Sequence, residues 1–255
     1  MIVCKSPAEL EKMRAANQLV AQVLEELAAM VAPGVTTADL DAAAEARVRA
    51  AGAEPAFKGY RGYPATLCAS VNEQVVHGIP GNRALAEGDI ISLDMGVKLN
   101  GFYGDSAVTV PVGKVSEEAS ALLRVTREAL EKGIAQVRLG GRVSDIGHAI
   151  QLHVEAHGFS VVREFVGHGI GSALHEEPQI ANYGEPGRGP RLAEGMTLAI
   201  EPMVNIGRPA VKVLADGWTA VTKDGSLSAH FEHTVAVTKS GPLVMTRRSV
   251  STPAA

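Results

Sequence analysis

The sequence has few cysteines, no excess of positive charge and no long apolar run. Its two cysteines, Cys4 and Cys68, are too few for a disulfide framework, which favours a reducing compartment. A net charge of −4 and a pI near 6.1 give no basic footprint for nucleic acid. No segment approaches the roughly 18 apolar residues of a membrane span, and the N-terminus has no signal-peptide core. We therefore expect a cytoplasmic protein without a nucleic-acid or membrane partner.

Two helix pairs, each followed by strands, are expected along the chain. Ser6 and Glu9 form a capping box before apolar residues at helical spacing, which predicts a helix over about 7–31. The remaining expected elements are, in order, a helix to about residue 51, a strand region over 67–76, a hairpin, and a second helix pair over about 116–157.

Short motifs recur in the second half of the chain in the same order. His-Gly-Ile occurs at His77 and again at His168, and Leu-Ala-Glu-Gly precedes two separate predicted strands. This recurrence predicts a duplicated helix-helix-strand-hairpin unit, over about 7–113 and 116–241. We expect one α+β domain over 1–255, with a pseudo-two-fold axis, a central antiparallel sheet and helices outside it.

The stretch 85–105 predicts a hairpin that carries two carboxylates. Apolar residues alternate around Asp94, which is the pattern of a strand with one apolar face. A two-residue turn at Asn100–Gly101 predicts these opposed pairs: Leu99 with Phe102, Gly96 with Asp105, and Asp94 with Ala107. Asp94 and Asp105 then share a face, with Cβ atoms roughly 5–8 Å apart. Two like charges at that distance require a cation between them or a raised pKa.

The repeat predicts two further acidic positions. Glu201 matches Asp94 in the second copy, and Glu232 follows as the partner of Asp105 on a closing strand. Any one of them could be an exposed strand carboxylate, but four at matched positions indicate a buried cluster that cations must neutralise. Two divalent ions would supply that charge. Oxygen-rich ligation with one imidazole disfavours a structural zinc and suits manganese, iron(II) or cobalt.

Histidines accompany these acids. His168 is expected to be a metal ligand, and His175 follows it in the same loop. Symmetry would make His77 a ligand too, so its role stays open at this point. The other histidines are expected outside the ligand set: His148, His153 and His157 on a solvated helix face, and His230 and His233 at the border of the site.

Several loop residues could form the wall of an apolar pocket beside these motifs. Core packing is an equal alternative for each of them, because cysteine and aromatic residues are common in protein interiors. They are Tyr60, Tyr63, Cys68, Leu174 and Trp218.

The motifs HGIP, LDMGVKLNGFYGD, GHGIG with HEEP, IEP and SLSAHFEHT resemble, in order, those of the type I methionine aminopeptidases. The resemblance runs from KSPAELEKMR to the last strand. It implies the pitta-bread fold and a centre of two divalent metal ions, with Asp105 and Glu232 bridging. The ligands that it implies are Asp94, Asp105, His168, Glu201 and Glu232.

The resemblance also implies roles outside the ligand set. His77 matches the family's catalytic histidine that does not bind metal, and His175 matches its partner near the scissile carbonyl. A monovalent cation is implied near Asn72, Gln74 and Ser228. The chain departs from the family at three positions around the pocket, and these departures concern the shape of the pocket rather than the chemistry: Phe57, Val76 and Leu174.

The expected activity is removal of the N-terminal methionine from newly made proteins and peptides that have a small second residue. Glu201 is expected to accept the proton of the attacking water. We expect a monomer, and association with the ribosome stays open. The alternatives are an X-Pro aminopeptidase or prolidase on the same fold, and a metal-free binding protein that keeps this fold.

Overall fold

The computed structural model describes residues 1–248, so the last seven positions of the predicted domain lie outside the described part. Residues 1–248 contain four α-helices: α1 (Pro7–Met30), α2 (Thr37–Ala50), α3 (Glu117–Ile134) and α4 (Val143–Ala156). A 3₁₀ turn, η1, spans Tyr60–Gly62. The first-half strands are β1 (Glu54–Pro55), β2 (Leu67–Val71), β3 (Gln74–Val76), β4 (Ile90–Leu99) and β5 (Phe102–Pro111). The later strands are β6 (Ser160–Val161), β7 (Gly167–Gly169), β8 (Glu176–Ile180), β9 (Thr197–Ile200), β10 (Met203–Asn205), β11 (Val211–Val213), β12 (Ala220–Thr222), β13 (Ser228–His230), β14 (Glu232–Thr238) and β15 (Gly241–Val244).

One antiparallel sheet joins the two halves of the chain. Its strand order is β1-β4-β5-β14-β9-β7-β8, with β2 added beside β4 and β15 beside β14. The junction is the pairing of β5 with β14, where Glu232 lies opposite Ala107 and His233 lies opposite Ser106. Because strands from both halves meet there, side chains on this pair of strands can face each other across the junction.

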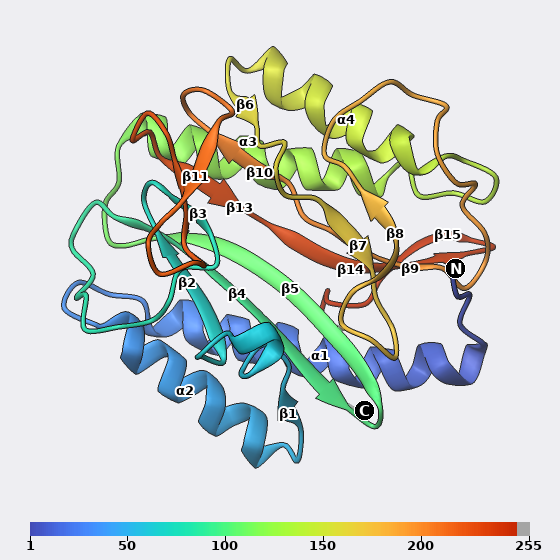
Figure 1. Cartoon of the computed structure of the whole chain (residues 1–255), viewed down its shortest axis with the longest axis horizontal. Helices are drawn as coiled ribbons and strands as arrows, with labels where there is room; N and C mark the ends of the chain where they lie inside the picture. Colours follow the sequence, from blue (N-terminus) through green and yellow to red (C-terminus); the bar gives the residue numbers. More distant parts are fainter. Residues whose placement is uncertain (249–255) are drawn as a thin grey trace, which may run out of the picture.

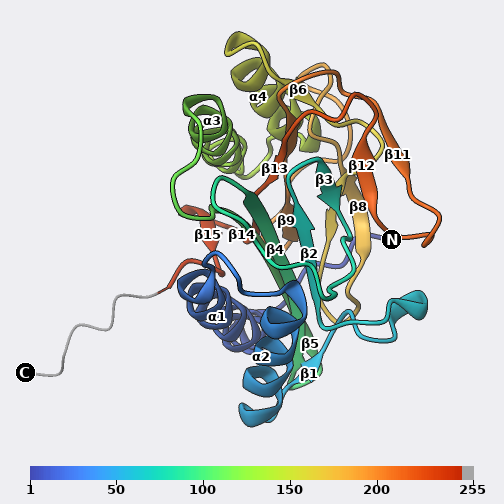
Figure 2. The ribbon, with the colours of Figure 1, turned by 90° about the vertical axis from the view of Figure 1, so that its left-hand side faces the viewer.

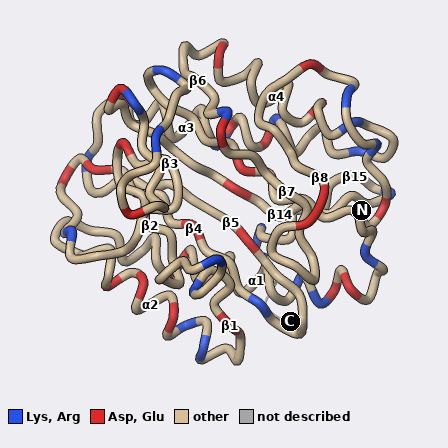
Figure 3. The backbone as a smooth tube through the Cα atoms, in the orientation of Figure 1, with Lys and Arg blue, Asp and Glu red and all other residues tan. Residues whose placement is uncertain are grey.

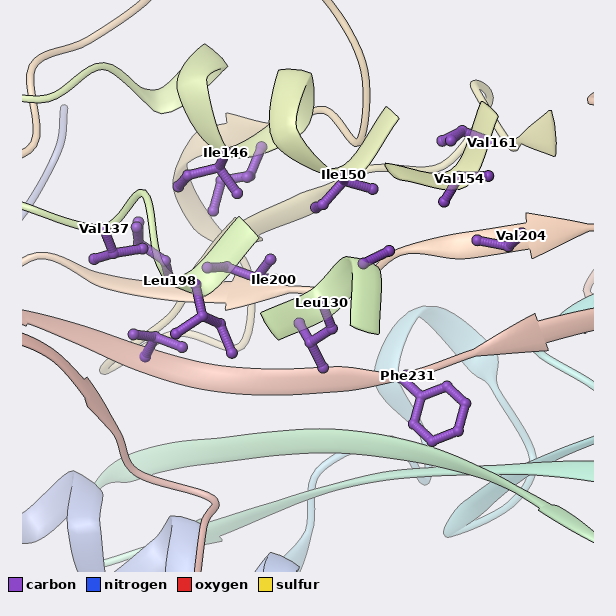
Figure 4. Packing of buried hydrophobic residues seen from close by; sticks show 14 of the residues in the cluster. Leu130, Val137, Ile146, Ile150, Val154, Val161, Leu198, Ile200, Val204 and Phe231 are labelled. Carbon is purple, nitrogen blue, oxygen red and sulfur yellow. The ribbon is translucent and has the colours of Figure 1, made fainter. Parts of the chain in front are cut away.

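The helix pairs flank the two halves of the sheet. Helix α1 packs on β4 and β5, and α3 contacts β9, β13 and β14 (Figures 1 and 2). Two separate apolar cores result. Leu130, Ile146 and Ile150 belong to the core under α3 and α4 (Figure 4), and a second core lies under α1 and α2. Val108 on β5 packs against both cores, so the two cores meet at this central strand of the sheet.

Local signals set the helix starts as expected. The Ser6 side chain and the Glu9 side chain cap the first turn of α1 reciprocally, which confirms the predicted capping box. Thr36 caps α2 in the same way with Asp39. In the described part of the chain, none of the helices combines the length and the apolar character that crossing a membrane requires.

The β4–β5 hairpin has the predicted register. Gly96 lies opposite Asp105, and Asp94 lies opposite Ala107. Asn100 and Gly101 both adopt positive φ angles, 53° and 82°, as a two-residue hairpin turn requires. The expected strand over 67–76 is instead two strands, β2 and β3, because Asn72 turns the chain with a φ of 58°.

Candidate metal centre

Five acidic and imidazole side chains converge where β4, β5, β7, β9 and β14 meet. Asp94, Asp105 and Glu232 are each at most 8% exposed, and so is His168. Glu201 follows β9 directly, and its side chain is 14% exposed. Figure 3 shows acidic positions within the inner strands, whereas Lys and Arg positions gather at the periphery. The four carboxylates therefore lie together in a desolvated place.

The buried carboxylates have oxygen atoms without partners. Oδ1 of Asp94, Oδ1 of Asp105 and Oε1 of Glu232 are buried and accept no hydrogen bond. Burial raises the pKa of Asp105 to about 7. Burial and the neighbouring acids raise the pKa values of Asp94, Glu201 and Glu232 well above their ordinary range. As anions these groups need a counter-charge at the site itself.

A divalent cation fits this arrangement. One ligand atom each from Asp105, His168 and Glu232 lies within 4.8 Å of the other two. Carboxylate oxygens with an imidazole suit manganese, iron(II) or cobalt. The three residues that carry the orphaned oxygens line the same cavity, so the residues that are present fit the metal centre that the sequence predicts.

His168 is prepared as a ligand. Its Nδ1 lies 2.8 Å from the carbonyl oxygen of Gly169 and donates to it, which leaves the lone pair on Nε2. Nε2 lies 3.6 Å from Oε1 of Glu201. Burial, and then the nearby His175, lower the pKa of His168 to about 4, so the ring is neutral at pH 7, as metal binding requires.

His77 and His175 lie in the same cavity without belonging to this cluster. The ring of His77 contacts Phe165 and Trp218 edge to face, with centroids 5.5 and 6.3 Å away. Desolvation, and then His175, lower the pKa of His77 to about 4. His175 is tilted against His168 with centroids 4.2 Å apart. Burial, and then the nearby Arg61, also lower the pKa of His175, so both histidines are neutral groups beside the carboxylates at pH 7.

One cavity of about 160 Å³ holds the whole constellation. The five expected ligands, His77 and His175 line it, together with the residues expected for an apolar wall, Tyr60, Tyr63, Cys68, Leu174 and Trp218. Phe57 and Arg61 complete its lining. Val76, the third departure from the family pattern, packs in a separate buried cluster with Val162 and Met203.

The expected monovalent-cation residues are adjacent but already hydrogen-bonded. The backbone N–H of Ser228 donates to the carbonyl of Asn72 over 2.9 Å. The side-chain oxygen of Asn72 accepts from Ile90, and that of Gln74 accepts from Val71. Their amide oxygens thus hold the β2–β3 turn, and a cation there would have to rely on backbone carbonyl groups.

Sequence reasoning placed His230 only at the border of the site, but it lies closer. Its ring is 1% exposed, and Nε2 lies 3.7 Å from Oε2 of Glu201. A usable signal was present in the sequence, since His230 precedes Glu232 by two residues and residues two apart on a strand share a face.

Comparison with known proteins agrees with this geometry. The sequence model of Metallopeptidase family M24 matches residues 11–239. Methionine aminopeptidase 1 of Bacillus subtilis is 56% identical over 247 residues, which cover 97% of this chain and all of that protein. The crystal structure of a methionine aminopeptidase from Thermotoga maritima is 50% identical with a TM-score of 0.96, covering 97% of this chain and all of that one. Prolidase from Pyrococcus furiosus, 20% identical, shares the fold with a TM-score of 0.80 over 97% of this chain and 66% of its own.

The fold and the carboxylate–imidazole cluster define a metallopeptidase with the pitta-bread architecture, as the sequence predicts. The chain belongs to metallopeptidase family M24, among its type I methionine aminopeptidases.

Proposed function

We propose that this chain removes the N-terminal methionine from newly made proteins and peptides, and that it prefers a small second residue. One observation carries the proposal: the five side chains expected as metal ligands and two neutral histidines line a single cavity that also has an apolar wall. The names of its relatives support the same activity.

Asp94, Asp105, His168, Glu201 and Glu232 would hold two divalent ions, with Asp105 and Glu232 shared between them. Such ions would polarise the carbonyl of the first peptide bond and make water a stronger nucleophile at neutral pH. Manganese, iron(II) and cobalt each suit these donors. The shared role of Asp105 and Glu232 is what the family resemblance implies, and these two residues lie on β5 and β14, the strands that join the two halves.

Glu201 would accept the proton of the attacking water and return it to the departing amine. It is the least buried of the four acids, and it lies at the end of β9 rather than within a strand. His175 would donate a hydrogen bond to the developing oxyanion. Its Nδ1 lies 2.9 Å from the hydroxyl of Tyr60, and a hydrogen bond donated by that hydroxyl leaves the proton of the neutral ring on Nε2.

His77 would contact the amide of the second residue, and its ring orientation is held by Phe165 and Trp218. The wall that includes Cys68 and Leu174 would receive the unbranched methionine side chain, which adapts to irregular apolar space. Crowding around the scissile bond would exclude large second residues. The free amino group would lie at the carboxylates, which explains why internal peptide bonds are not substrates.

The setting of the activity is part of the proposal. We place the chain in the cytoplasm as a monomer that acts on the N-termini of new proteins, with ribosome association as an open extension. A monovalent cation near Asn72, Gln74 and Ser228 would stabilise the turn before His77.

Peptide hydrolysis tests the proposal. The protein is stripped with a chelator and reloaded anaerobically with manganese, iron(II) or cobalt. Met-Ala-Ser should be cleaved far faster than Met-Pro or Gly-Pro peptides, and activity should disappear on chelation and return with metal. Faster cleavage of the proline peptides would instead establish the X-Pro alternative. A protein that stays inactive with every metal would support the binding-protein alternative.

A further inference from the structure

His230 is a buried imidazole that has no hydrogen-bond partner on either ring nitrogen. Burying an unpartnered polar group is unfavourable, and native proteins keep such groups chiefly where function requires them. The strand pairing does not leave this side chain free to turn away. The backbone N–H of His230 donates to Oγ1 of Thr109, and its carbonyl accepts from the same hydroxyl. On the other side, β13 pairs with β10, where His230 lies opposite Met203.

Within residues 1–248, the ion pair of His230 is with one acidic side chain, that of Glu201. Nε2 of His230 lies 3.7 Å from Oε2 of Glu201, while the other oxygen, Oε1, lies 3.6 Å from Nε2 of His168. The carboxylate thus sits between two imidazoles, one from each side. His168 commits its Nδ1 proton to Gly169 and can offer only a lone pair, whereas His230 has both nitrogens uncommitted.

We propose that His230 is a positioning residue whose Nε2–H donates to Oε2 of Glu201 and thereby turns Oε1 toward the metal site. The inference rests on the proposed function, since it assigns Glu201 a ligand role. The present separation exceeds a hydrogen bond by roughly half an ångström, a gap that a small rotation of the carboxylate closes. A carboxylate held on one oxygen keeps the other in place for a metal ion, as groups behind metal ligands commonly do.

His230→Leu and His230→Gln test this role, with His148→Leu as a control outside the site. Four quantities are measured: Mn²⁺ affinity by calorimetry, the melting temperature of the metal-free protein, and kcat and KM for Met-Ala-Ser. Leucine should weaken Mn²⁺ binding about ten- to hundredfold and lower kcat more than it changes KM. The melting temperature of the metal-free protein should stay close to that of the unaltered chain, which shows that the variant is folded and that the weaker Mn²⁺ binding reports the lost donor.

Glutamine keeps a donor at a similar reach, so His230→Gln should retain Mn²⁺ affinity within a few fold. If glutamine weakens binding as much as leucine, His230 binds metal directly and the positioning role is wrong. Unchanged affinity in His230→Leu would also overturn it. Calorimetry and melting do not depend on the substrate, so failure to cleave Met-Ala-Ser would reject the proposed function alone.

A separate observation concerns α3 and α4 on the outer surface. His148 and His153 were expected to face solvent, but both are half-buried, and only His157 is exposed. Nε2 of His153 lies 3.1 Å from Oε2 of Glu128 on α3. One ligand atom each from Glu128, His153 and His157 lies within 4.8 Å of the other two. Glu128 comes from another helix, so the local sequence around the two histidines does not reveal it as the third ligand.

The geometry points to a second cation site here, made of two imidazoles and a carboxylate, which is a donor set that Zn²⁺ accepts with water as the fourth ligand. His153 and His157 are one helical turn apart, with ring centroids 4.6 Å from each other. Nδ1 of His157 bonds to the carbonyl of His153, so its Nε2 remains available. A bound ion would link α3 to α4. Arg124 opposes it, since its guanidinium lies 3.1 Å from the same Glu128 oxygen.

Zinc stoichiometry and affinity by equilibrium dialysis test the second site. The unaltered chain should bind one more Zn²⁺ than a variant with His153→Gln and His157→Gln, whereas His148→Gln should change nothing. Glu128→Gln should weaken this extra binding about tenfold or more, and Arg124→Gln should strengthen it several-fold because the competing cation is removed. Equal stoichiometry in the double variant would overturn the site. So would affinities that ignore Glu128 and Arg124.

Discussion

The hydroxyl oxygen of Tyr60 lies 2.9 Å from Nδ1 of His175, and their rings stack with centroids 5.2 Å apart. Tyr60 belongs to η1, a short turn in which Arg61 has a φ of 50°, so a strained loop presents this hydroxyl to His175. The contact is a single neutral hydrogen bond. Its function would be to select the ring tautomer that has its proton on Nε2.

Tyr60→Phe should therefore lower kcat by roughly two- to tenfold, which corresponds to about 0.5–1.5 kcal/mol for one hydrogen bond. The ring stacking is retained, so KM and metal content should stay the same. Steady-state kinetics on Met-Ala-Ser measures the effect. Tyr183→Phe, on a separate surface cavity beside Arg163, is the matched control and should be neutral. A full-rate Tyr60→Phe variant would remove Tyr60 from the mechanism.

Substitution of Asp105 should abolish metal binding, whereas substitution of His77 should lower the catalytic rate and leave metal binding intact. Asp105→Ala and Glu232→Ala should each abolish binding of two ions, because each would remove a ligand that we propose the two ions share. His77→Ala should bind metal normally and lose roughly 10²–10⁴-fold in kcat, which is typical for loss of a group acting at the reacting bond. Metal analysis after dialysis, combined with kinetics, checks both. A fully active His77→Ala protein, or two ions retained by Asp105→Ala, would contradict these roles.

The features of this site that depend on neighbouring residues could be predicted from the sequence. Those that depend on contacts between distant segments could not. The β4–β5 register follows from alternation around Asp94 and from the turn at Asn100–Gly101, which are properties of neighbouring residues. The approach of His230 to Glu201, by contrast, depends on where β10 and β13 pair. The spacing of His230 from Glu232 indicates the face on which His230 lies, but it does not give the distance to Glu201.

The Glu128–His153 contact has the same origin, because it requires α3 and α4 to pack side by side. The broken strand at Asn72 is a smaller miss. Its positive φ is a turn conformation that asparagine tolerates, and a strand pattern conceals it.

In the metal-free protein, ionisation of the Asp105 carboxyl should lower the free energy of unfolding as the pH rises. Burial raises its pKa from 3.8 to about 7, so the folded state binds the proton more tightly than the unfolded state. The carboxyl therefore costs nothing below about pH 4, and its destabilising effect grows until the pH passes 7. Asp105→Asn should match the unaltered protein's melting temperature near pH 4.5 and exceed it increasingly up to pH 8. Thermal unfolding in excess chelator measures this difference.

The surface carboxylate of Asp216 is a control, because its effect on stability should change with pH in the opposite direction to that of Asp105. The hydroxyl of Thr219 lowers the pKa of Asp216, so the stabilisation from that contact is present at neutral pH and is lost as the pH falls through the folded pKa. Asp216→Asn should lower the melting temperature at pH 8 and approach the unaltered value in acid. If Asp105→Asn showed that trend instead, the buried carboxylate would have a counter-charge that the structure does not show.

Gly104 couples the packing of α1 to the position of Asp105. A Cβ atom at Gly104 would lie 2.8 Å from the backbone nitrogen of Asn17 and 2.9 Å from the carbonyl carbon of Ala16. Neither is a flexible side chain, so Gly104→Ala must push β5 away from α1. The cost should be about 1–3 kcal/mol of stability, as for other overpacked sites. Because Asp105 is the next residue, Mn²⁺ affinity should fall as well.

Gly81→Ala is the control for Gly104→Ala, since nothing lies within 4 Å of its added Cβ. It should leave stability within about 0.5 kcal/mol of the unaltered protein and leave Mn²⁺ affinity unchanged. Chemical denaturation and calorimetry on both variants give the comparison. If Gly104→Ala were destabilised but bound Mn²⁺ normally, strand β5 would have adjusted without moving Asp105. The coupling between α1 packing and the metal site would then be wrong.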